Sequence, residues 1–172
     1  MQAIDQVRAL YGYNEWANGH VLDAAAQISG DEFARELGAS FGSVQGNLMH
    51  TLSAQNVWLS RWTPSPPPEM PRADRGVSIE ALRQAYDASH AGLRAFVESL
   101  SDERLDRAFD YVDTEGNAQR ARLGITMLHV ANHGTHHRAE TALLLTALGK
   151  APRQLDYGFY ELERAGGRPR LT

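Results

Sequence analysis

Cysteine is absent from this chain of 172 residues. Disulfide bonds and thiolate metal ligands are therefore excluded, and any bound metal ion must be held by histidine, aspartate or glutamate. Long apolar runs are also missing, because no stretch reaches the roughly 18 residues that a membrane-spanning helix needs. Residues 1–5 lack the basic and apolar segments of a secretory signal. We therefore expect a cytoplasmic protein without a membrane-spanning segment.

An excess of positive charge is missing too, since 17 lysine and arginine residues stand against 21 aspartate and glutamate residues, and the formal net charge is −4. A surface that follows nucleic-acid phosphates needs a basic patch. The arginines are scattered instead, and the cluster of Arg164, Arg168 and Arg170 lies in a glycine- and proline-containing tail that we expect to be solvated. No nucleic-acid partner is expected.

Length and composition predict one globular domain over residues 1–172. Hydrophobic residues make up 42% of the chain and charged residues 22%, which is typical of an ordinary globular protein. A chain of this length can bury a substantial core without disulfide bonds or a structural metal ion.

Four long segments show helical periodicity, with apolar residues recurring at steps of three and four. Ser43 and Ser78 are suited to cap the second and third segments, and Gly149 ends the fourth. Four long amphipathic helices predict an all-α fold, an antiparallel four-helix bundle. The predicted helices cover residues 2–28, 43–62, 78–100 and 125–148.

The connections between these helices are long. Residues 63–71 contain five of the seven prolines and cannot form a helix or a central strand, so we expect an exposed crossover there. Residues 105–123 lose the helical period around Gly116 and Asn117, which predicts a small β-hairpin before the last long helix. A short helix is expected at residues 157–163.

Histidines dominate the chemistry that the sequence offers. On the fourth helix, a rotation of about 100° per residue places His133 and His137 on an apolar row, whereas His129 and His136 fall on the neighbouring row. Two histidines four residues apart project from one helix face, so both can reach one metal ion. Neutral imidazole is a natural ligand for zinc, nickel, copper and iron.

The His-x-x-x-His spacing alone is a short pattern that partly exposed histidines also satisfy. Burial of both rings on an apolar row would require polar partners, which a metal ion would supply. Gly134 stands where zinc proteases with a His-Glu-x-x-His helix have glutamate, so this turn contains no general base. His20 and His90 show no partner and are expected at the surface, and core positions are expected for Trp16, Trp58 and Trp62.

His50, on the second helix, is the candidate third ligand. It lies about half a turn from the apolar row of Leu48 and Leu52. Its small neighbours Gly46 and Ala54 could leave room for a pocket, or they could mark an exposed side. Three protein ligands with an open coordination position describe a reactive metal site rather than a structural one.

Glu140 is a candidate partner of these rings, because it follows His137 by three residues and His136 by four. It could orient His137 by accepting the second imidazole N–H, it could pair with His136, or it could be a solvated charge. His129 and His136 are expected around the ligands or at the rim of the site.

Three stretches together resemble the DinB/YfiT-like superfamily of metal-dependent bundle proteins. They are residues 13–18 (YNEWAN), residues 43–59 (beginning SVQGNLMH) and residues 129–138 (HVANHGTHHR), and the likeness spans about residues 13–148. The Gly-Gln that usually follows His-His-Arg in this superfamily is Ala139-Glu140 here.

The resemblance implies a four-helix bundle and a divalent metal ion, zinc or nickel, held by His50, His133 and His137. It also implies a homodimer and a stress-associated bacterial setting. Some members of the superfamily transfer low-molecular-weight thiols such as bacillithiol or mycothiol to electrophiles, and others isomerise maleylpyruvate.

Our leading hypothesis is a metal-dependent thiol transferase with a small-molecule substrate and a low-molecular-weight thiol as cosubstrate. Metal coordination lowers the pKa of a thiol, and a chain without cysteine would take its nucleophile from the cosubstrate. The alternatives are a metal-dependent hydrolase or isomerase, and a non-catalytic metal-binding stress protein.

Overall fold

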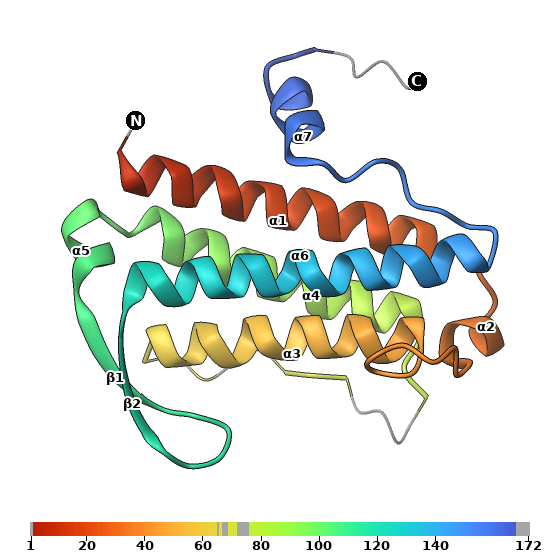
Figure 1. Cartoon of the computed structure of the whole chain (residues 1–172), viewed down its shortest axis with the longest axis horizontal. Helices are drawn as coiled ribbons and strands as arrows, with labels where there is room; N and C mark the ends of the chain where they lie inside the picture. The colour runs from red at the N-terminus through yellow and green to blue at the C-terminus, as the bar shows by residue number, and fades with distance from the viewer. Residues whose placement is uncertain (1, 65, 67–68, 72–75, 168–172) are drawn as a thin grey trace.

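Four long helices lie side by side along the length of the molecule (Figure 1). The structure is a computed structural model that describes residues 2–64, 66, 69–71 and 76–167. The predicted helical bundle is confirmed, and the expected serine caps Ser43 and Ser78 accept backbone N–H groups of Gly46 and Ala81. The long helices are α1 (Ala3–Ala25), α3 (Val44–Trp62), α4 (Ile79–Glu98) and α6 (Leu123–Ala147).

The bundle consists of two antiparallel pairs. α3 runs against α6, and α1 runs against α4, while α1 and α6 point the same way (Figure 1). The proline-containing crossover after α3 returns the chain to the other end of the bundle, so α3 and α4 also share one direction. This arrangement brings the middle of α3 against the middle of α6.

The predicted hairpin is also confirmed. Strand β1 (Ala108–Val112) pairs antiparallel with β2 (Ala118–Arg122), in a register that joins Ala108 to Arg122 and Val112 to Ala118. The Asp113 carboxylate accepts the backbone N–H groups of Glu115 and Asn117 and so closes the turn. The hairpin leads directly into α6.

Short helices complete the chain. The expected helix near the carboxyl end is α7 (Tyr157–Arg164). Two single-turn helices were not predicted, α2 (Gly30–Ala34) and α5 (Asp102–Asp106). α1 ends three residues earlier than expected because Ser29 begins α2 with a capping box that involves Glu32. Some residues of the proline segment, and Arg168 and Arg170, lie outside the described residues.

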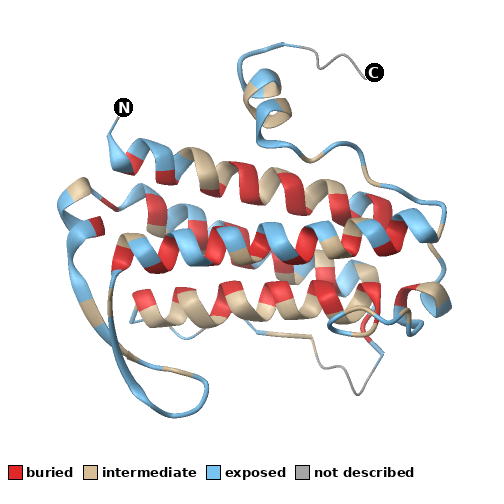
Figure 2. Ribbon diagram, in the orientation of Figure 1, coloured by how far each residue is buried: buried red, intermediate tan, exposed pale blue. Residues whose placement is uncertain are grey.

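Buried residues line the facing sides of the four long helices (Figure 2). One apolar cluster includes Leu48, Leu82 and Leu145, and a second includes Tyr11 and Met127. Among the described residues, no helix has both the length and the apolar composition that a bilayer span requires.

A layer of buried polar side chains also crosses the bundle. It contains Asn14, Asn18, Gln55, His90 and Arg138. The expected surface position of His90 is therefore wrong: its side chain is buried, and its Nε2 lies 3.0 Å from the Asn18 amide nitrogen. Asn18 of α1 supplies a partner that could not be recognised from His90 alone.

Tryptophan positions follow the prediction only in part. Trp62 is buried in the core, and its indole N–H donates to the Thr126 hydroxyl. Trp16 and Trp58 are half-buried and lie at the edge of the bundle. His20, expected at the surface, is half-buried with its ring edge-on to Trp16.

Candidate metal centre

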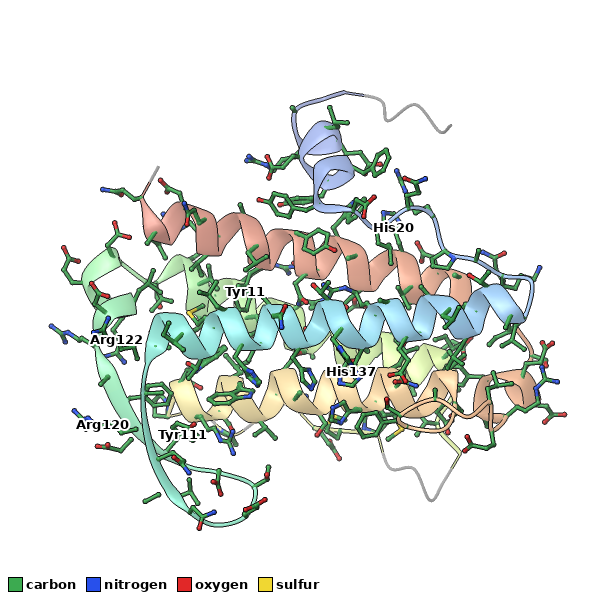
Figure 3. The ribbon with its side chains drawn as sticks, viewed as in Figure 1. Tyr11, His20, Tyr111, Arg120, Arg122 and His137 are labelled. Carbon is green, nitrogen blue, oxygen red and sulfur yellow. The ribbon has the colours of Figure 1, made fainter. Side chains whose placement is uncertain are left out.

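Three histidines from two helices converge at the centre of one face of the bundle. His50 comes from α3, and His133 and His137 come from α6; each offers one ligand atom, and these atoms all lie within 4.8 Å of one another. The Nε2 atoms of His50 and His133 are 3.0 Å apart. Figure 3 shows His137 between the ribbons of α6 and α3. We call these residues the histidine triad.

Gly46, four residues before His50, allows the 35–43 loop to pack on α3. The small neighbours of His50 therefore make room for this loop instead of marking an exposed side of the helix. A Cβ on Gly46 would lie 1.9 Å from the Phe41 carbonyl oxygen. The 35–43 loop therefore packs directly on the first turn of α3. This contact places the Phe41 ring on His50, with ring centroids 3.6 Å apart and an interplanar angle of 14°.

The histidine triad suits a metal ion. Nitrogen ligands about 2.0–2.1 Å from a tetrahedral ion are roughly 3.4 Å from one another, which is close to the His50–His133 separation of 3.0 Å. Burial, followed by the imidazoles of His137 and His50, lowers the pKa of His133 to about 4. Burial also lowers the pKa of His50. Both rings are therefore neutral at pH 7, which is the form that binds a metal.

Glu140 lies between His137 and the 35–43 loop. Its Oε2 is 3.4 Å from His137 Nδ1, and its Oε1 accepts the Ser40 backbone N–H at 2.6 Å. The Ser40 N–H is the main reason why the pKa of Glu140 is lowered, and His137 adds to the effect. A carboxylate at Nδ1 leaves Nε2 of His137 available to a metal ion.

His129 and His136 flank the histidine triad and are both exposed. The His136 ring meets His137 edge-on, with centroids 4.8 Å apart, and the His129 ring is 5.9 Å from His133. Neither belongs to the converging group, and no second group of this kind occurs in the part of the chain that the structure describes.

Sequence reasoning missed three residues near the site. Phe41 and Ser40 belong to an irregular loop, where no periodic pattern could indicate them. Arg138 is buried, and its guanidinium donates to the side-chain oxygens of Asn14 and Asn18 on α1 and of Thr135. The sequence feature that could have indicated a buried partner for Arg138 is the pair Asn14 and Asn18, four residues apart on α1.

Gly134 has a packing role. A Cβ at this position would lie 2.8 Å from the Asn14 side-chain oxygen and 2.9 Å from Arg138 Nη1. Glycine thus allows α1 to approach α6 beside the histidine triad. Because a side chain at position 134 would collide with these groups, the helix has no room for a glutamate between its histidines. The site consequently presents three nitrogen donors, one adjacent carboxylate and an aromatic ring.

Comparison with known proteins identifies the family of this chain. "Protein DinB" of Bacillus subtilis (strain 168) is 22% identical over an alignment of 167 residues, which covers 88% of this chain and 91% of the relative. The model of the DinB family matches residues 1–168, nearly the whole length. The chain therefore belongs to the DinB family.

Proposed function

We propose that the chain binds one divalent metal ion, zinc or nickel, through His50, His133 and His137, and that it is an enzyme that transfers a low-molecular-weight thiol to a small electrophile. The observation that supports metal binding is the convergence of three imidazoles with ligand atoms within 4.8 Å. Thiol transfer is supported by the absence of cysteine and by the resemblance of the ligand segments to a superfamily in which some members transfer thiols.

The protein groups around the site have separable tasks. The bound ion would lower the pKa of a coordinated thiol and make its thiolate available at neutral pH. Glu140 orients the His137 ring through Nδ1. Phe41 covers one face of His50 and keeps water from that side of the ring.

Elemental analysis of purified variants tests the metal site. We expect about one equivalent of metal in the wild-type protein and a large loss in His50→Ala, His133→Ala and His137→Ala. His129→Ala is the matched control, because it removes an exposed imidazole from the same helix, outside the histidine triad. Full occupancy in His133→Ala or His137→Ala would show that the assignment is wrong.

Conjugation of small thiols to a model electrophile tests the chemistry. Bacillithiol, mycothiol and glutathione should be compared with metal-loaded and metal-depleted protein. The loaded protein is expected to accelerate the reaction of one thiol, with a rate that falls in His50→Ala and His137→Ala. Metal binding without acceleration of any thiol would reject the transferase proposal and favour hydrolysis, isomerisation or a binding role.

The homodimer implied by the resemblance is part of the proposal. Three large apolar side chains, those of Ile125, Leu128 and Leu143, are 61%, 51% and 69% exposed along α6. Such a row on one helix supports association with a second copy. Light scattering coupled to size exclusion should report twice the chain mass, and Leu128→Glu should reduce that mass; a monomeric wild-type protein would contradict the proposal.

A further inference from the structure

Aromatic side chains gather beside the histidine triad, at the end of the bundle that faces the hairpin. Trp58 and Tyr111 have ring centroids 5.2 Å apart, and the Arg61 guanidinium carbon lies 4.7 Å and 5.1 Å from these two centroids. The His129 ring meets Trp58 at 5.5 Å. We call these four residues the aromatic–arginine cluster. It joins α3, β1 and α6.

The aromatic–arginine cluster continues into the histidine triad. His129 connects the two, since its ring is 5.5 Å from Trp58 and 5.9 Å from His133. On α3, Arg61 follows His50 by eleven residues, which returns it to nearly the same helix face about 16 Å along the axis. In Figure 3, Tyr111 lies beside the hairpin and His137 lies nearer the middle of the bundle. A ligand of moderate length could contact both sites.

The guanidinium of Arg61 has N–H donors available for a ligand. The guanidinium carbon lies over the two rings, and aromatic rings do not use up the N–H donors of a guanidinium, which can still bind a carboxylate. Within the described residues, Arg61 forms no ion pair and no side-chain hydrogen bond, whereas Arg120 on β2 pairs with Asp110 at 2.8 Å. The half-buried Trp58, Arg61 and Tyr111 and the exposed His129 leave this surface accessible.

We propose that the aromatic–arginine cluster binds an organic carboxylate that has an aryl or other planar unsaturated group. The carboxylate accepts hydrogen bonds from the Arg61 guanidinium, whose fork of donors matches its two oxygens. The planar group packs against Trp58 and His129. That this ligand is the far end of the enzyme's substrate or cosubstrate rests on the proposed function, whereas the binding itself does not.

A pair of isosteric probes tests the proposal on metal-depleted full-length protein, so that a carboxylate cannot bind a metal ion instead. Trans-cinnamate and its neutral amide, trans-cinnamamide, have the same shape and differ in charge. Titration followed by ligand-observed NMR should show cinnamate binding about tenfold more tightly than the amide, because only the carboxylate forms charge-assisted hydrogen bonds. Equal affinities, or no binding of cinnamate, would overturn the proposal.

Variants locate the site. Arg61→Gln should reduce the affinity ratio of the two probes to about one, Arg61→Lys should give an intermediate ratio, and Trp58→Ala should weaken both probes. Arg120→Gln removes the same charge from the neighbouring hairpin and should leave the ratio unchanged. If Arg61→Gln lowers both affinities equally, the residue only holds the hairpin against α3 and the proposal is wrong.

Metal content separates this proposal from the proposed function. Arg61→Gln should retain the metal occupancy of the wild-type protein, because Arg61 is not part of the histidine triad. A protein that discriminates the probes but holds no metal would sustain the carboxylate site and reject the metal centre. The reverse result would reject the carboxylate site alone.

Discussion

Glu140 is the residue whose two oxygens join the metal centre to the 35–43 loop. Glu140→Gln keeps the shape and removes the charge, so we expect the affinity for metal to fall roughly tenfold or more, as is usual when the carboxylate behind a metal-bound imidazole is lost. Competition with a chromophoric chelator measures the dissociation constant. Glu98→Gln, an exposed change on α4, is the control. A dissociation constant equal to that of the wild-type protein would show that Glu140 does not support the metal site and only holds the 35–43 loop through Ser40.

His90 should make the stability of the protein sensitive to acid. Burial lowers the pKa of His90 to about 4, against an ordinary value of 6.5. As the pH falls from about 6.5 to 4, the imidazole of His90 is protonated in the unfolded chain but not in the folded protein. The free energy of unfolding therefore decreases over this range. His90→Gln, measured by urea unfolding with chelator present, should reduce the loss of stability between pH 7 and pH 5 by at most about 2 kcal/mol. An unchanged pH dependence would contradict this assignment.

Some site residues could be predicted from the sequence, and the reason is periodicity. His133 and His137 were recognisable because an α-helix places residues four apart on one face. His50 was ambiguous, since its position depends on how closely the 35–43 loop approaches Gly46. His90 and Arg138 were missed because their burial depends on partners in α1, and contacts between distant helices leave no local pattern.

At the scale of elements, the contact between the 35–43 loop and α3 depends on a glycine. Alanine normally stabilises a helix by about 1 kcal/mol relative to glycine, but a Cβ on Gly46 would lie 1.9 Å from the Phe41 carbonyl oxygen, a backbone atom. We therefore expect Gly46→Ala to lower the free energy of unfolding, by roughly 1–3 kcal/mol as for an overpacked site.

Gly19→Ala is the matched control for this change, because it alters a helical glycine whose added Cβ would meet no atom within 4 Å. It should stabilise the protein by about 0.5–1 kcal/mol in the same urea titrations. A Gly46→Ala protein as stable as the Gly19→Ala protein would show that the loop moves away without cost.

The long helices and the hairpin could be predicted because each has a strong local signal: an apolar period, a serine cap or a glycine turn. The single-turn helices α2 and α5 are too short for a period to show. The common direction of α3 and α4 was equally hidden, because a proline-rich segment indicates an extended connection without fixing where it leads.

At the scale of the whole molecule, the metal should add stability without being required for folding. Two apolar clusters already hold the bundle together, and a ligand that binds only the folded state adds about 4 kcal/mol at a thousand times its dissociation constant. A chelator should lower Tm while the helical circular dichroism at 25 °C persists. Loss of the helical signal on chelation would show instead that the site is structural.

The distance along the chain between His50 and His133, 83 residues, also concerns the order of events in folding. A metal held by both would close a large loop, and contacts of such high sequence separation form late because their entropic cost is high. The ion would then bind after α3 has docked on α6. Saturating metal should therefore leave the refolding rate nearly unchanged and slow unfolding, so that the bound ion increases the kinetic stability of the folded bundle.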